Sequence, residues 1–96
     1  MIRHVVLFSL AEAPQKSAVM EQFKAAIEDL PRSIDWIRQI SVRFNRNPEE
    51  EYDLVLTADF DSLDDVRRYA AHPLHVAAGR LLAPLKKARA CVDFEL

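Results

Sequence analysis

The sequence predicts an α+β fold, in which a four-stranded antiparallel sheet in ferredoxin-like βαββαβ order carries helices on one face. Four segments alternate apolar and other side chains with the period of a strand, and two connections between them place apolar residues at helical spacings of three and four. The chain has 96 residues with a single glycine, which is typical of one compact domain spanning residues 1–96 without a flexible linker.

The first predicted strand runs from Ile2 to Leu10. Its even-numbered residues, among them His4, Val6 and Phe8, share one face, and its odd-numbered residues share the other. Both faces are largely apolar, so both need to be covered. His4 has two interpretations: a neutral core histidine with one satisfied nitrogen, or a polar group that lines a pocket beneath the helices.

The first predicted helix begins near Pro14, which suits a first helical turn, and Pro31 stops it. Phe23 and Ile27 lie on the apolar stripe of this helix and point at the sheet. They are therefore expected to be core residues first and pocket walls second.

A hairpin follows the first helix. Residues 39–44 and 52–60 alternate as strands do, and the polar segment NRNPEEE between them has the asparagine and proline content of a turn. Leu56 lies in the second of these strands, on the same side as its apolar neighbours.

The second helical region is predicted to break at its centre. Ser62 and Asp65 have the spacing of a helix start, in which the serine oxygen accepts a backbone N–H. Pro73 has no N–H and disfavours helical geometry at His72, so a helix that arrives through Tyr69 must end or bend there. A further helical pattern then runs to residue 85, and residues 89–96 form the last strand.

One face of this sheet would be covered by the helices, and the other would not. We assign to the helices the face that is almost wholly apolar, which includes Ile2, Ile40, Leu54 and Val92. The opposite face, which includes Cys91, is mixed but too apolar to leave in water. A second copy of the sheet is its natural cover, so we expect a homodimer with a barrel-like interior.

Composition excludes several classes of protein. With 13 basic and 15 acidic residues, the net charge of −2 gives no field that would attract nucleic acid or an anionic membrane. No apolar run approaches the roughly 20 residues that span a bilayer. The single cysteine, Cys91, cannot form an internal disulfide, and the first ten residues do not resemble a signal peptide, so we expect a cytoplasmic protein.

The segment YAAHPLH, residues 69–75, holds most of the candidate chemistry. Tyr69 and His75 could act as a proton-handling pair, because an imidazole titrates near neutrality and a phenol donates a hydrogen bond. The alternative is that Tyr69 packs in the core and that His72 and His75 cap backbone at the bend. With His4 the segment offers three imidazoles, but it has no HExxH spacing and no nearby carboxylate, so no metal site is predicted.

Four stretches together resemble the stress-responsive A/B barrel family, the Dabb domains: IRHVVLF, YDLVLTADFDS, YAAHPLH and ACVDFEL. The resemblance covers nearly the whole chain, and its most specific part is HPLH with the preceding tyrosine. It implies a homodimeric α+β barrel with sheets facing each other and a cavity in each protomer between sheet and helices. Most members of the family have no assigned activity.

A plant member of this family closes a linear polyketide by aldol condensation without a cofactor. Carried over by position, Tyr69 and His75 match its tyrosine and histidine. The resemblance implies that the ligand-binding positions are His4, Val6, Phe8, Phe23, Ile27, Leu56 and His72. Leu54 and Ala26 stand where that enzyme has a histidine and a tyrosine, so its substrate does not carry over.

Two functions are consistent with these residues. The first is a non-catalytic homodimer that binds a small apolar or aromatic molecule, because the expected pocket is mostly aliphatic. The second is a cofactor-independent enzyme in which His75 takes the proton α to a carbonyl and Tyr69 holds the imidazole or the developing enolate oxygen. An RNA-binding role is disfavoured, because neither middle strand presents stacking aromatics beside basic residues.

Overall fold

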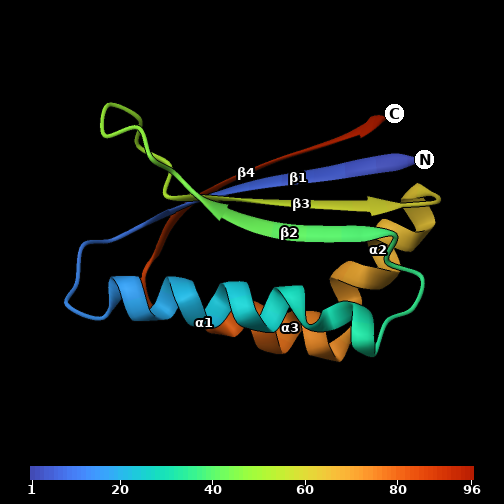
Figure 1. Ribbon diagram of the computed structural model, residues 1–96, viewed down its shortest axis with the longest axis horizontal. Helices are drawn as coiled ribbons and strands as arrows, with labels where there is room; N and C mark the ends of the chain where they lie inside the picture. Colours follow the sequence, from blue (N-terminus) through green and yellow to red (C-terminus); the bar gives the residue numbers. More distant parts are fainter.

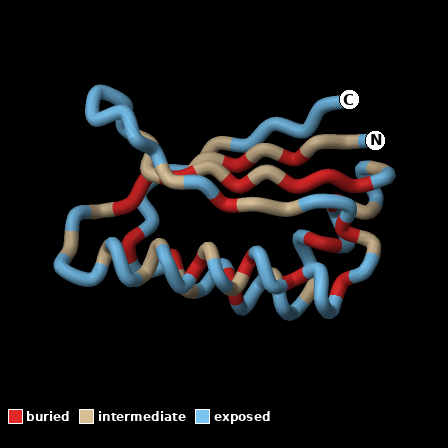
Figure 2. The backbone as a smooth tube through the Cα atoms, viewed as in Figure 1, coloured by how far each residue is buried: buried red, intermediate tan, exposed pale blue.

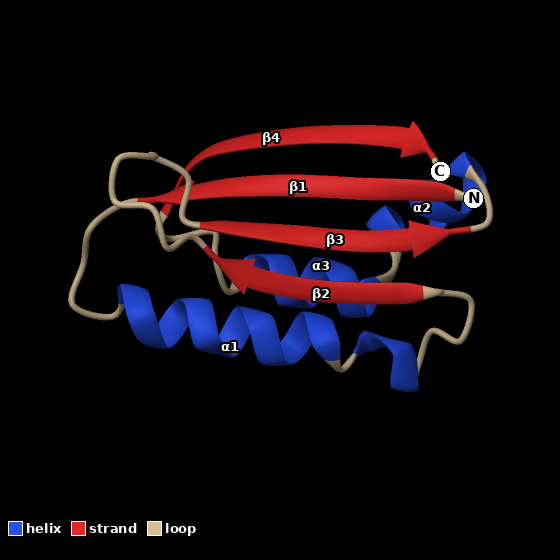
Figure 3. Cartoon of the chain, turned by 45° about the horizontal axis from the view of Figure 1, so that its top comes forward, coloured by secondary structure: helices blue, strands red, loops and turns tan.

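A computed structural model describes residues 1–96. The elements, in chain order, are β1 (Ile2–Leu10), α1 (Lys16–Glu28), the short 3₁₀ helix η1 (Leu30–Arg32), β2 (Gln39–Phe44), β3 (Leu54–Phe60), α2 (Leu63–Ala71), α3 (Pro73–Arg80) and β4 (Lys86–Glu95). The strands form one antiparallel sheet in the order β2-β3-β1-β4, seen edge to edge in Figure 3. The predicted ferredoxin-like α+β fold is confirmed.

All the helices lie against one face of the sheet, and no element covers the other face (Figure 1). The buried residues accordingly gather between the two layers, as Figure 2 shows. A single cluster of 17 buried hydrophobic residues fills this space. Phe23 and Ile27 of α1, Val42 of β2 and Phe60 of β3 are its almost fully buried members, together with Tyr69 of α2.

Local chemistry explains where the helices begin and end. The Ser62 Oγ accepts a hydrogen bond from the Asp65 N–H at 3.2 Å, which is the helix start that the sequence predicts. After α1, the chain continues into η1, where Pro31 occupies the first turn. Pro31 therefore ends the α-helix by converting it to a tighter 3₁₀ turn.

The break in the second helical region lies where proline predicts it. Helix α2 ends at Ala71, and His72 has extended backbone angles, with φ −66° and ψ 133°. Its side chain then caps the next helix, since His72 Nδ1 accepts a hydrogen bond from the Leu74 N–H at 3.1 Å. Pro73 takes the first position of α3, where a missing N–H costs nothing.

Helix α3 is shorter than the sequence pattern predicts. It ends at Arg80, and residues up to Leu85 continue as turns in which Leu82 and Leu85 donate backbone hydrogen bonds three residues back. This tightening brings both leucines into the core while the chain turns toward the sheet. Strand β4 therefore begins at Lys86, before the predicted start at residue 89.

The pairing of β4 corrects the predicted assignment of its faces. Cys91 lies opposite Val6 of β1, and Val92 lies opposite Val5. Because directly opposed residues share a face, Cys91 is on the helix side and Val92 on the open side, so both assignments were wrong. The reason is that the apolar alternation of β4 belongs to the open face, while its helix-side residues are polar or small.

Candidate functional site

A cavity of about 170 Å³ lies between the sheet and the helices. Every strand except β2 contributes to its wall, as do α1, α2 and α3. Among the predicted site residues, the wall contains His4, Val6, Phe8, Phe23, Leu56, Tyr69 and His75. Lys86 and Arg89 of β4 complete the wall at positions that the sequence did not single out.

The break between α2 and α3 turns Tyr69 and His75 toward each other. Their ring centroids are 4.3 Å apart with an angle of 47° between the planes. The Tyr69 ring also packs 5.1 Å from Phe60, and the residue has no exposed surface. The structure thus brings the two predicted catalytic residues into direct contact.

The Tyr69 hydroxyl has no hydrogen-bond partner although it is buried. Burial raises the pKa of Tyr69, so the side chain remains a neutral phenol. A buried hydroxyl without a partner costs free energy, commonly about 1–3 kcal/mol. Here the hydroxyl belongs to a residue of the cavity wall, so it is free to donate a hydrogen bond to a bound molecule.

His75 is held with one nitrogen engaged and the other free. Its Nδ1 lies 3.0 Å from the Ala70 carbonyl oxygen, which can only accept, so Nδ1 carries the proton. Burial lowers the pKa of His75, and the positive charges of His4, Arg89 and His72 add to the effect. The neutral ring therefore presents Nε2 as a proton acceptor near neutral pH.

His4 is fixed by β4. Its Nδ1 donates to Asp93 Oδ1 at 2.5 Å and lies 3.6 Å from Cys91 Sγ. Its ring is 6.0 Å from the Tyr69 ring. The sequence did not indicate Asp93 or Cys91 as site residues. The face of β4 that carries them was assigned to the open side of the sheet, away from the cavity.

The ligand atoms of His4, Cys91 and Asp93 lie within 4.8 Å of one another, which is the spacing of a group able to hold a metal ion. The possible metal ligands considered from the sequence were a different group, namely His4, His72 and His75. Partial burial and the charge of Asp93 raise the pKa of the Cys91 thiol, and thiolate is the form that binds metals. This group is therefore better suited to the hydrogen bond between His4 and Asp93 than to holding a metal ion.

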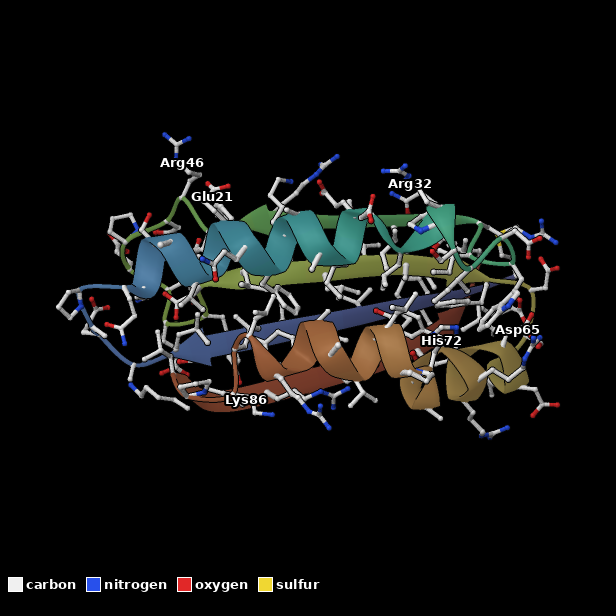
Figure 4. All side chains as sticks on the ribbon, turned by 90° about the horizontal axis from the view of Figure 1, so that it is seen from below. Glu21, Arg32, Arg46, Asp65, His72 and Lys86 are labelled. Carbon is white, nitrogen blue, oxygen red and sulfur yellow. The ribbon has the colours of Figure 1, made fainter.

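Two predicted ligand-binding residues lie outside the cavity wall. His72 caps α3 at the far end of the helix from Lys86, as Figure 4 shows from the helix side. Ile27 has no exposed surface and packs in the core. The position of each residue in the fold explains its structural role, since His72 caps α3 and Ile27 packs in the core.

A larger cleft of about 630 Å³ lies beside the β2–β3 loop. Only one of its 12 lining residues is hydrophobic, and the charge of Lys16 is paired, since its Nζ lies 2.6 Å from Glu12 and 2.9 Å from Asp53. The cleft is mainly polar, and its unpaired charged side chains, Arg46, Glu50, Glu51 and Lys87, are exposed. The smaller cavity at Tyr69 is therefore the better candidate site.

The pattern of the Stress responsive A/B Barrel Domain, Dabb, matches residues 2–96. The chain belongs to the Dabb family. This confirms the resemblance seen in the sequence, and no curated protein matches the chain.

Solved structures similar to this Dabb protein include a dimeric ferredoxin-like protein of unknown function from Bacteroides fragilis, with 50% identity, a TM-score of 0.95, and coverage of 99% of this chain and 95% of that one. A dimeric ferredoxin-like protein of unknown function from Thermobifida fusca has 32% identity, a TM-score of 0.83 and coverage of 99% and 90%. A Dabb protein from Mesorhizobium loti shares the fold at 24% identity and a TM-score of 0.77, with coverage of 99% and 95%. None of the helices in this Dabb domain is both long and apolar enough to cross a membrane.

The lowered pKa of His75 predicts how stability depends on pH. Because the folded pKa of His75 lies below the ordinary value of 6.5, the unfolded chain binds a proton first as the pH falls. Stability from this group is complete above that value and declines below it, until the pH reaches the folded pKa. Urea unfolding from pH 7.5 to 5 should show this decline in the wild type and a smaller one in His75→Asn, whose amide can still donate to Ala70. An equal decline in both proteins would contradict the assignment.

Proposed function

We propose that this Dabb protein is a homodimer that binds a small apolar or aromatic molecule in the cavity at Tyr69. The observation that carries the proposal is the buried, unpartnered Tyr69 hydroxyl in the wall of a largely apolar cavity. A ligand with a hydrogen-bond acceptor would satisfy that hydroxyl while its apolar body contacts Phe8, Phe23 and Leu56. The volume suits one ring, since a dry protein cavity of about 150 Å³ accommodates benzene.

Benzyl alcohol is a suitable neutral probe. We expect it to shift the NMR resonances of Val6, Leu56 and Tyr69 in a saturable way, and to raise the midpoint of thermal unfolding as its concentration exceeds the Kd. Resonances of the Lys16 cleft should not move and serve as the internal control. Shifts confined to the open face of the sheet, or none at all, would contradict binding in the cavity.

The homodimer is supported by the open face of the sheet. Val92 and Phe94 expose 55% and 42% of their surface there, and β4 is exposed along almost its whole length (Figure 2). Two of the charges on this face are already paired, since Arg3 donates to both oxygens of Asp59 at 2.8 and 2.9 Å. Similar proteins with 50% and 32% identity are dimers. A second sheet could therefore cover the apolar side chains and the Arg3–Asp59 pair, while the unpaired Arg43 lies on the edge strand β2.

A charge at Val92 should separate the protomers. We expect Val92→Glu to weaken the dimer by at least about 100-fold, because a buried, unpaired carboxylate is costly. Sedimentation velocity over a range of concentrations measures the change. Leu63→Glu is the matched control, since Leu63 is exposed on α2, on the other side of the sheet, and it should leave the dimer intact. A dimer unaffected by Val92→Glu would place the interface elsewhere.

A cofactor-independent enzyme is the second candidate, and the contact between Tyr69 and His75 favours it. His75 Nε2 would remove the proton from the carbon α to a carbonyl. The electron pair of that C–H bond would move to the carbonyl oxygen, where the Tyr69 hydroxyl would donate a hydrogen bond to the enolate. Both side chains would take part in this step in their neutral forms, His75 as the proton acceptor and Tyr69 as the hydrogen-bond donor.

Exchange of α-protons tests this candidate directly. In D₂O, the wild type should accelerate loss of the methyl proton signal of acetophenone, and His75→Asn should slow the catalysed exchange by about 100-fold or more. His72→Asn is the matched control, because asparagine remains a good N-cap and His72 lies outside the cavity. If both variants exchange protons at the wild-type rate, His75 is not the base.

A further inference from the structure

We propose that the cavity selects an anion, and that its ligand is a small aromatic or apolar acid whose carboxylate lies between Lys86 and Arg89. This inference rests on the proposed function, because it concerns the same cavity. It adds the chemical class of the ligand, which neither the family nor the similar structures specify.

The wall of the cavity carries an unbalanced charge. Lys86 and Arg89 both belong to it, and it contains no aspartate or glutamate. Neither cation forms an ion pair anywhere in the structure. By contrast, Lys16 and Lys24 are each paired with at least one carboxylate. Arg43, Arg46, Arg80 and Lys87 also form no ion pair, but none of them lines this cavity. The distinguishing feature of the cavity is therefore that two unpaired cations adjoin its apolar side chains.

The carboxylate that follows these cations on the helix side of β4 is already engaged. Asp93 lies on the same strand, but its Oδ1 accepts the hydrogen bond from His4 Nδ1 at 2.5 Å. It is not part of the cavity wall. Arg89 hydrogen-bonds the Cys91 side chain. The two cations nevertheless lack a carboxylate partner within the chain, and an anion from outside would supply one.

The register of β4 places the cations next to the apolar wall. Lys86 is paired with Leu10 and Arg89 with Phe8, both on the helix side of β1. The Phe8 ring contacts the Phe23 ring edge-on at 5.8 Å, and Figure 4 shows Lys86 beside the C-terminal end of α3. An apolar surface therefore adjoins two charged groups, which is the arrangement that an amphipathic acid would match.

Carboxylate is the anion that fits this arrangement. The planar guanidinium of Arg89 can bind both carboxylate oxygens at once, while Lys86 contributes a compact charge. A single ring attached to that carboxylate would occupy the cavity of about 170 Å³. The Tyr69 hydroxyl then remains available for a further acceptor on the ring.

Calorimetric titration of the full chain at low salt with three probes tests the inference. Benzoate carries ring and charge, benzyl alcohol carries the ring alone, and inorganic phosphate carries charge alone. We expect benzoate to bind at least about tenfold more tightly than either of the others. Added sodium chloride should weaken the binding of benzoate and leave that of benzyl alcohol unchanged.

Charge-neutral variants identify the groups responsible. Lys86→Gln combined with Arg89→Gln should remove the preference for benzoate while benzyl alcohol still binds. Arg46→Gln combined with Lys87→Gln is the matched control, because it also removes two positive charges, and Arg46 and Lys87 line the outer cleft and not the cavity. It should retain the preference. Both cavity cations are exposed, and a thermal unfolding curve checks that the double variant is folded.

The outcomes separate the two proposals. Equal binding of benzoate and benzyl alcohol would overturn the anion inference and leave the proposed function standing. Phosphate binding as tight as that of benzoate would also overturn it, since the ring would then contribute nothing. If neither ring compound binds, the proposed function fails and the inference fails with it. A preference for benzoate that survives in the double variant would place the anion elsewhere.

Discussion

The missing N–H of Pro73 is the constraint on which the candidate site depends. On an unbroken helix, residues six apart are turned by about 240° and face different directions. The break at His72 ends one helix and starts another, and it brings the rings of Tyr69 and His75 to 4.3 Å. The cap that His72 provides makes this bend a stable local structure. The chemistry of the cavity thus follows from a backbone property of one residue.

Much of the fold could be predicted because its signals are local. The alternation in β1, the hairpin, the Ser62 cap and the proline break each depend on residues close together in the chain. The orientation of β4 is different, because it depends on pairing with β1 across the whole sequence. Val92 and Cys91 lie on opposite faces of the sheet whichever face of β4 is turned toward the helices, and both faces of the sheet accept apolar residues. Alternation alone therefore could not decide which of them faces the helices.

The same limit explains which site residues were found. Tyr69 and His75 stand out by chemistry and by the family motif, so the sequence identified them. Arg89 and Asp93 are ordinary charged residues until the register of β4 turns them to the helix side. Their position on the helix side follows from the pairing of β4 with β1 and cannot be predicted from composition. His72 also has a distinctive side chain, and its position makes it a helix cap outside the cavity wall.

Strand β4 also forms one edge of the sheet, and its side chains differ between the two faces. Along the helix side it carries Arg89, Asp93 and Glu95, and along the open side Val92 and Phe94. Charged side chains beside an unpaired edge oppose the addition of another strand, which is how sheets extend into fibrils. The apolar side favours stacking of whole sheets. The two sides of the strand thus act differently: one opposes edge-to-edge extension of the sheet, and the other leaves its open face available for stacking.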